Sequence, residues 1–271
     1  MSLESAYKVA IFISDLQYCF SFRDQRAVRN NLKVILQTQE VAPELVREVF
    51  RNFGRYLVEF FRVEKTINQE FIKTKVKIEN WENIDKALAQ GKGGIVISAH
   101  LGNWELGGIL LGMLGNPVMA VALPHKERPV NDLFNHQREV KGMTVVSTNH
   151  AVRKCFEQLK NNQMVALVAD RDFSLSGEII DFLGRKAFLP KGIAILSIKT
   201  GAPIVPVFLI REENNHFRLA IHQPIFPDTV QNDAIEDAVI IKFIKKYIVI
   251  IEEQIRKYPT QWLMFREFWI K

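Results

Sequence analysis

The stretch Gly94-Ile95-Val96-Ile97-Ser98-Ala99-His100-Leu101-Gly102-Asn103-Trp104-Glu105 decides the fold. Its first half is an apolar run that predicts a buried strand, and the apolar run Leu106 to Leu114 that follows predicts a packed helix. A histidine at the end of a strand lies at the rim of a sheet, where open α/β folds place their chemistry. We therefore expect an α/β fold with a functional site around His100.

His100 and Glu105 form a candidate pair of base and orienting group. A carboxylate in the first helical turn can reach back to an imidazole, fix its tautomer and stabilise the imidazolium. A purely structural interpretation is also open, in which Asn103 caps the helix, Glu105 interacts with the helix dipole, and His100 is a hydrogen-bonded rim residue. A His/Glu pair by itself favours the structural interpretation, so the rest of the chain has to decide.

Composition limits the class of protein. The chain has 271 residues, of which 48% are hydrophobic and 24% charged, as in a soluble globular protein with a sizeable core. Its net charge of +6 suits an anionic partner such as nucleic acid, a phosphorylated small molecule, a membrane surface or an acidic carrier protein. Cys19 and Cys155 form no CxxC motif and no metal spacing, which predicts a reducing compartment.

The order of patterns along the chain predicts two layers in one domain. Residues 1–75 read as helical, with an apolar segment Leu3 to Phe22, a basic amphipathic segment Arg23 to Leu36, and an apolar stripe over Pro43 to Val63. From Val76 onward apolar runs alternate with helical patterns, which predicts a mostly parallel central sheet flanked by helices. We expect one domain over residues 1–271, with a helical N-terminal layer over 1–75 and an α/β core over 76–271.

The expected strands are Ile95–Ser98, Val118–Leu123, Thr144–Ser147, Val165–Ala169, Ile179–Phe182, Ile204–Leu209 and Phe217–Ile221. The expected helices of the core are Asn83–Gln90, Trp104–Leu114, Val130–Lys141, Ala151–Lys160, Lys191–Thr200 and a long one from about Ala234 to Lys257. The uncharged stretch from Leu106 to Pro124 is long enough for a membrane span, but glycines and the Asn116-Pro117 step interrupt it.

Several common motifs are missing from the sequence. It contains no GxSxG, GxGxxG, GxxxxGK[ST] or HExxH motif, and no second histidine stands at ligand spacing from His100. We therefore expect no metal and no cofactor. The basic residues are spread along the chain without a recognisable nucleic-acid module, so we expect no nucleic-acid partner.

Two further clusters follow His100. Asp170-Arg171-Asp172 comes directly after an expected strand and therefore lies at a sheet rim, although such residues are also common loop caps. The second cluster runs from Leu189-Pro190-Lys191-Gly192 to Thr200-Gly201-Ala202-Pro203, and a helix start, a glycine stop and a buried strand explain most of it.

Taken together and in this order, the clusters resemble the lipid A biosynthesis acyltransferase family. This branch of the HxxxxD/E acyltransferases includes phosphatidylinositol mannoside acyltransferases, and the resemblance spans nearly the whole chain, from the basic stretch Arg26 to Leu32 to the segment Arg256 to Trp262. An HxxxxE motif alone is a weak signal, whereas all these clusters in series are a strong one. The chain departs from the family pattern at Leu183, where a second Phe is usual, and in lacking a clean N-terminal span.

The resemblance implies a glycerolipid acyltransferase-like fold and an enzyme that moves a fatty acyl group from a thioester, of acyl carrier protein or coenzyme A, to a hydroxyl of a membrane glycolipid. His100 would be the base and Glu105 its orienting residue. The residues expected to bind substrate are Arg138, Asp170, Arg171, Asp172 and Lys191, with Arg138 and Arg171 as candidates to stabilise the oxyanion and Lys126 and Lys199 as further cations. An apolar groove for the acyl chain is expected to be lined by Trp104, Leu106, Phe173 and Phe182.

Two other functions stay open at this point, a lysophospholipid acyltransferase and a non-catalytic peripheral membrane or carrier-binding protein. The lipid acceptor and the resemblance imply a location at the cytoplasmic face of the bacterial inner membrane. The apolar segment Leu3 to Phe22 is followed by Arg23, Arg26, Arg29 and Lys33, which predicts an interfacial anchor on an anionic membrane surface. The rival interpretation is a helix packed on the α/β core.

Overall fold

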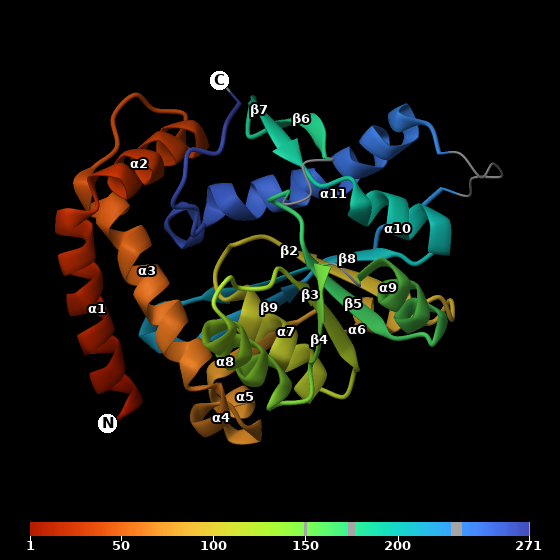
Figure 1. The fold of residues 1–271 in the computed structure, drawn as a ribbon, viewed down its shortest axis with the longest axis horizontal. Helices are drawn as coiled ribbons and strands as arrows, with labels where there is room; N and C mark the ends of the chain where they lie inside the picture. The colour runs from red at the N-terminus through yellow and green to blue at the C-terminus, as the bar shows by residue number, and fades with distance from the viewer. Residues whose placement is uncertain (149–150, 173–176, 229–234, 271) are drawn as a thin grey trace.

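A mostly parallel sheet forms the centre of the computed structural model, which describes residues 1–148, 151–172, 177–228 and 235–270 (Figure 1). In these ranges the sheet has seven strands in the order β1-β9-β8-β2-β5-β3-β4, and every neighbouring pair is parallel except β8 with β9. The strands are β1 (Val76–Glu79), β2 (Gly94–Ser98), β3 (Val118–Ala122), β4 (Thr144–Ser147), β5 (Met164–Val168), β8 (Ile204–Arg211) and β9 (Phe217–Ile221). The expected α/β class with a mostly parallel sheet is confirmed.

Strand β2 occupies the middle because its apolar residues are buried on both faces, as parallel strands require. Ile95 and Ile97 point to one core, and Val96 points to the other. The helices α9 (Ala151–Lys160), α10 (Gly192–Thr200) and α11 (Asp237–Lys257) contribute to the first core, and α5 (Gln69–Lys75), α6 (Glu82–Leu88) and α7 (Trp104–Met113) to the second. Figure 1 shows these two sets of helices on opposite sides of the sheet.

The register of β2 against β5 positions the candidate site. Ser98 is paired with Val168, so the chain leaves both strands at the same level of the rim. His100 and Asp170 each lie two residues beyond that pair. Helix α8 (Arg128–Glu139) lies near the same region, beyond the end of β3.

The structure contains two strands that were not expected, β1 at the edge of the main sheet and β7 in a separate hairpin. The expected strand Ile179–Phe182 is present as β6 (Glu178–Phe182), but it pairs antiparallel with β7 (Arg185–Leu189) outside the main sheet. Strand β7 was not expected. The start expected for the long C-terminal helix, Ala234, lies outside the described residues, and the helix runs from Asp237 to Lys257.

The N-terminal layer consists of α1 (Leu3–Phe20), α2 (Phe22–Leu36), α3 (Pro43–Phe61) and the short α4 (Val63–Thr66). Helices α1 and α3 run antiparallel in close contact, since a Cβ at Gly54 would collide with Ser14 Oγ and the Ala10 carbonyl. The opposite face of α1 is exposed and apolar, and its residues are Val9, Phe12, Ile13, Leu16 and Phe20. Within the described residues, no helix combines the length and the apolar character needed to cross a bilayer.

Candidate functional site

His100 and Asp170 meet at the carboxyl ends of two neighbouring parallel strands. His100 Nδ1 lies 2.8 Å from Asp170 Oδ1, and the backbone N–H of His100 donates to Asp170 Oδ2 at 2.9 Å. The indole N–H of Trp262 donates to the same Oδ2 at 2.8 Å. Asp170 is fully buried, so these contacts replace the water that a carboxylate would otherwise need.

Glu105 does not contact the His100 ring through a hydrogen bond. It forms a bidentate pair with Arg138, in which Nε donates to Oε2 at 2.8 Å and Nη2 to Oε1 at 2.5 Å. The cause is the helix that carries it, because Glu105 in the first turn of α7 faces Arg138 on α8. This corrects the expectation that Glu105 orients the imidazole, since Asp170 makes that contact.

The charges around His100 act on its proton affinity in opposite directions. Burial disfavours the imidazolium and lowers the pKa, but the charge of Asp170 and its hydrogen bond outweigh burial, and Glu105 adds to their effect. The pKa of His100 is therefore raised above its usual value. For Asp170, burial raises the pKa, but His100 and the Trp262 N–H reverse this and leave the pKa lowered. The pair thus favours a proton on the histidine and a charge on the aspartate.

Aromatic rings connect the site to the N-terminal layer. The Trp104 ring meets the His100 ring edge-on at 4.8 Å between centroids, and Tyr56 of α3 stacks on Trp104 at 4.6 Å. Arg138 is buried beside this stack, with its guanidinium 5.9 Å from the Phe60 ring and 5.7 Å from the Phe134 ring. Burial lowers the pKa of Arg138, but the hydrogen-bonded Glu105 raises it by more. Arg138 therefore stays charged inside an aromatic setting.

The C-terminal segment completes the site, and the sequence analysis did not assign it a role there. Besides the Trp262 contact to Asp170, the Leu263 N–H donates to the His100 carbonyl at 2.7 Å. The charge of Arg266 lowers the pKa of His100, so this arginine lies within electrostatic range. The only sequence signal was the final motif of the family resemblance, which ends at Trp262.

The remaining expected site residues lie at the rim and at the start of the β6–β7 hairpin, or are exposed. Arg171 follows Asp170 at the rim, and Asp172 accepts a hydrogen bond from the Gly177 N–H at 3.1 Å, as a loop residue does. Lys191, at the start of α10, forms an ion pair of 2.7 Å with Glu178 on β6. Lys126 and Lys199 are exposed.

The apolar groove expected for an acyl chain is not formed by the residues proposed for it. Leu106 and Phe182 are fully buried in the two cores, and Phe173 lies outside the described residues. Trp104 is half-buried against the His100 ring. The sequence showed that these positions are apolar, but it did not show which of them face the core.

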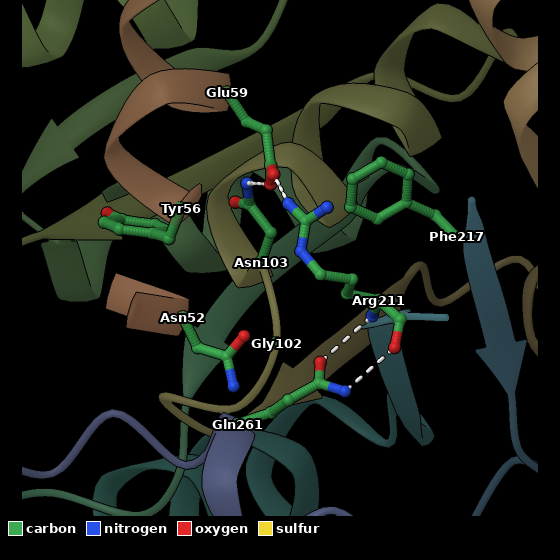
Figure 2. A pocket seen from close by; sticks show the side chains of 8 residues that line it. All are labelled: Asn52, Tyr56, Glu59, Gly102, Asn103, Arg211, Phe217 and Gln261. Atoms are coloured by element: carbon green, nitrogen blue, oxygen red, sulfur yellow. Dashed lines mark hydrogen bonds and ion pairs between the residues drawn. The ribbon is translucent and has the colours of Figure 1, made fainter. Parts of the chain in front are cut away.

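A small cavity is lined by Gly102 and Asn103 of the loop after His100 and by residues of α3, β8 and β9 (Figure 2). It measures about 10 Å³, which is room for about one water molecule. A wider groove of about 630 Å³ runs between α2, the β6–β7 turn and the C-terminal segment. His100 lines neither of these spaces.

Comparison with known proteins agrees with the resemblance seen in the sequence. A family model described as bacterial lipid A biosynthesis acyltransferase matches residues 4–271. The chain is 25% identical to the phosphatidylinositol mannoside acyltransferase of Mycolicibacterium smegmatis, over 99% of this chain and 87% of that protein. It is 32% identical to the enzyme of that name from Mycobacterium tuberculosis, over 66% of this chain and 59% of that protein. The lipid A biosynthesis palmitoleoyltransferase of Escherichia coli is 25% identical, over 90% of this chain and 78% of that protein.

Proposed function

Because the chain belongs to the bacterial lipid A biosynthesis acyltransferase family, we propose that it transfers a fatty acyl group from an acyl thioester to a hydroxyl of a membrane glycolipid. A lipid A precursor and a phosphatidylinositol mannoside are the two acceptors that the names of its relatives suggest. The observation that carries the proposal is the His100–Asp170 pair at the rim of the sheet. A hydroxyl is a poor nucleophile near neutral pH, and such a pair supplies the base it needs.

The proposed reaction has two proton transfers. Nε2 of His100 takes the hydroxyl proton while the oxygen attacks the thioester carbonyl carbon, and Asp170 holds Nδ1–H and stabilises the imidazolium. The tetrahedral intermediate then collapses, the C–S bond breaks, and the departing thiolate receives the proton from Nε2. The ester and the free thiol leave, and the imidazole is neutral again.

The negative charge of the intermediate needs donors, and two backbone N–H groups of the loop after His100 are already engaged. The Gly102 N–H donates to the Gln261 carbonyl at 3.0 Å and the Asn103 N–H to the Leu209 carbonyl at 2.9 Å. This supports a guanidinium as the stabilising group. Arg171, next to Asp170 in the chain, is our candidate.

We assign Arg138 and Glu105 a different role from the one expected. Their bidentate pair is nearly buried, so Glu105 holds Arg138 next to the Trp104–Tyr56 stack and its negative charge supports the imidazolium at a distance. Asp172 and Lys191 are assigned to loop and hairpin structure around the site, because Asp172 accepts from the Gly177 N–H and Lys191 pairs with Glu178.

The donor and the membrane are proposed from charge and exposure. The net charge of +6 suits acyl carrier protein or acyl-coenzyme A, both of which are anionic. In the sequence the apolar helix α1 is followed by Arg23, Arg26, Arg29 and Lys33 of α2, and Phe20 and Phe22 are 78% and 75% exposed. This combination supports docking on an anionic bilayer, at the cytoplasmic face of the inner membrane, without a spanning helix.

A single-turnover assay with a labelled acyl thioester and a total bacterial lipid extract tests the function. We expect label in a glycolipid, and transfer that is slower by roughly 10²–10⁴-fold with His100→Ala. Label in a diacyl phospholipid would identify a lysophospholipid acyltransferase instead. If neither acyl carrier protein nor coenzyme A thioesters give any transfer that depends on His100, the non-catalytic interpretation remains and the proposal is overturned.

A further inference from the structure

Glu59, on α3 of the N-terminal layer, is a buried carboxylate with partners from three other parts of the chain, two of which, Asn103 and Arg211, are drawn in Figure 2. Its Oε1 accepts from the Tyr7 hydroxyl at 3.0 Å and contacts the Arg211 guanidinium. Its Oε2 accepts from the Asn103 amide Nδ2 at 2.6 Å. Glu59 is only 3% exposed, and burial of a carboxylate is costly in free energy. We therefore ask what role this buried carboxylate and its three partners have.

Asn103 joins Glu59 to the loop that carries His100. Its Oδ1 accepts from the Leu106 N–H at 3.0 Å and so caps α7, while its Nδ2 is held by Glu59. The neighbouring Gly102 has φ of +63° and no room for a side chain, since a Cβ would collide with the Leu209 carbonyl oxygen. The loop between His100 and α7 is therefore fastened on both sides of Asn103.

Arg211 provides the second attachment. A pair of hydrogen bonds joins its backbone to the Gln261 side chain, at 3.0 Å from N to Oε1 and 2.8 Å from Nε2 to O. The Gln261 carbonyl in turn accepts the Gly102 N–H at 3.0 Å. Because the enclosed cavity has room for only about one water molecule, this cluster is not a substrate pocket.

We propose that Glu59 is a positioning residue of the acyltransferase, which acts through Asn103 to hold the His100 loop at the sheet rim. The inference rests on the proposed role of His100 as base. It makes the N-terminal layer part of the catalytic machinery, because the group that fixes the loop lies on α3. Displacement of a catalytic group by about 1 Å can cost on the order of 10²-fold in rate, so a fixed loop has a direct effect on turnover.

Two double variants with the same charge test the proposal. Both carry Arg211→Met, so that no unpaired guanidinium stays buried, and they differ only in Glu59→Gln or Glu59→Leu. The glutamine keeps a carbonyl oxygen for Asn103 Nδ2, and the leucine does not. We expect the kcat of the leucine variant to be lower than that of the glutamine variant by roughly 10- to 100-fold. The KM for the acyl thioester should match in both.

Hydrogen exchange of the amides in residues 100–106 gives a readout independent of activity. The leucine variant should exchange faster in this segment than the glutamine variant, with similar melting temperatures. Equal kcat and equal exchange in the two variants would overturn the positioning role. If the wild type itself transfers no acyl group, the proposed function fails, while the exchange comparison still decides whether Glu59 holds the loop.

Discussion

At the scale of single residues, Asp170 raises the proton affinity of His100. Nδ1 is bound to a buried carboxylate, so the proton from an acceptor hydroxyl has to go to Nε2. The base works only when it is neutral, and the pKa of His100 is raised. The rate should therefore rise with pH through a midpoint above the usual histidine value.

Replacement of His100 by alanine tests the base directly. His100→Ala should lower kcat by roughly 10²–10⁴-fold, because the hydroxyl loses its proton acceptor. The circular dichroism spectrum should be unchanged, since the ring is at the rim of the sheet and not in a core. Turnover within a few-fold of wild type would remove His100 from the mechanism.

Asp170→Asn should change both the height and the position of the pH profile. The amide keeps the shape of the side chain but removes the charge that raises the pKa of His100. The rising limb should therefore move to lower pH, and the plateau should fall because the imidazolium loses its counter-charge. Measurement of kcat against pH checks the midpoint and the plateau. A profile with an unmoved midpoint would contradict the assignment of Asp170 as the partner that raises the pKa of His100.

Glu105→Ala should act mainly on stability. Arg138 is only 7% exposed and would lose its bidentate partner, which typically costs about 3–5 kcal/mol for a buried pair. Urea unfolding measures this loss, with Glu157→Ala, an exposed pair with Arg153, as the control that should change little. If Glu105 bonded the imidazole instead, Glu105→Ala would shift the pH midpoint as strongly as Asp170→Asn.

The sequence indicated His100 and Asp170 as candidate site residues but did not predict that they contact each other. Both His100 and Asp170 were expected at strand ends, but which strands are neighbours is decided by the whole sheet. Glu105 was the nearer carboxylate in the chain, and a distance of five positions made it the natural expectation. The pairing of Ser98 with Val168 brings the more distant carboxylate to the ring instead.

At the scale of the elements, β7 is a strand that local sequence patterns did not predict. The turn before it consists of Leu183 and Gly184, both with positive φ, and a leucine is not a residue that signals such a turn. The Leu183 N–H is bound by Glu252 of α11, so a contact across the fold supports this conformation. The core helices and the parallel strands other than β1, by contrast, carried strong periodic signals and were predicted well.

Helix α1 packs against α3 on one face and, as we propose, binds a membrane with the other. Tyr7 and Ser14 face α3, so a deletion of residues 1–22 would disturb packing as well as exposure. Point substitutions on the exposed face separate the two effects. Phe12→Ser with Phe20→Ser should weaken sedimentation with anionic vesicles and leave the melting temperature unchanged.

Val152→Ser, which removes a residue 72% exposed on α9, provides the matched control for these vesicle experiments. It removes a similarly exposed apolar side chain from a different surface. Equal loss of binding in the control and the α1 variant would show a general effect of surface hydrophobicity. Full binding by the α1 variant would refute the anchor.

At the scale of the whole molecule, the excess of positive charge should influence donor binding. With a net charge of +6, the affinity for acyl-coenzyme A or acyl carrier protein should fall as salt rises from about 50 to 500 mM, since the Debye length shortens from roughly 14 Å to about 4 Å. An uncharged acyl thioester with a short thiol is the matched control, because it shares the reacting bond but not the phosphates or carboxylates. Its KM should not rise with salt, and equal slopes for charged and uncharged donors would exclude electrostatic recruitment. A steeper slope for the carrier protein than for coenzyme A would indicate that a wide basic surface, and not a single phosphate site, receives the donor.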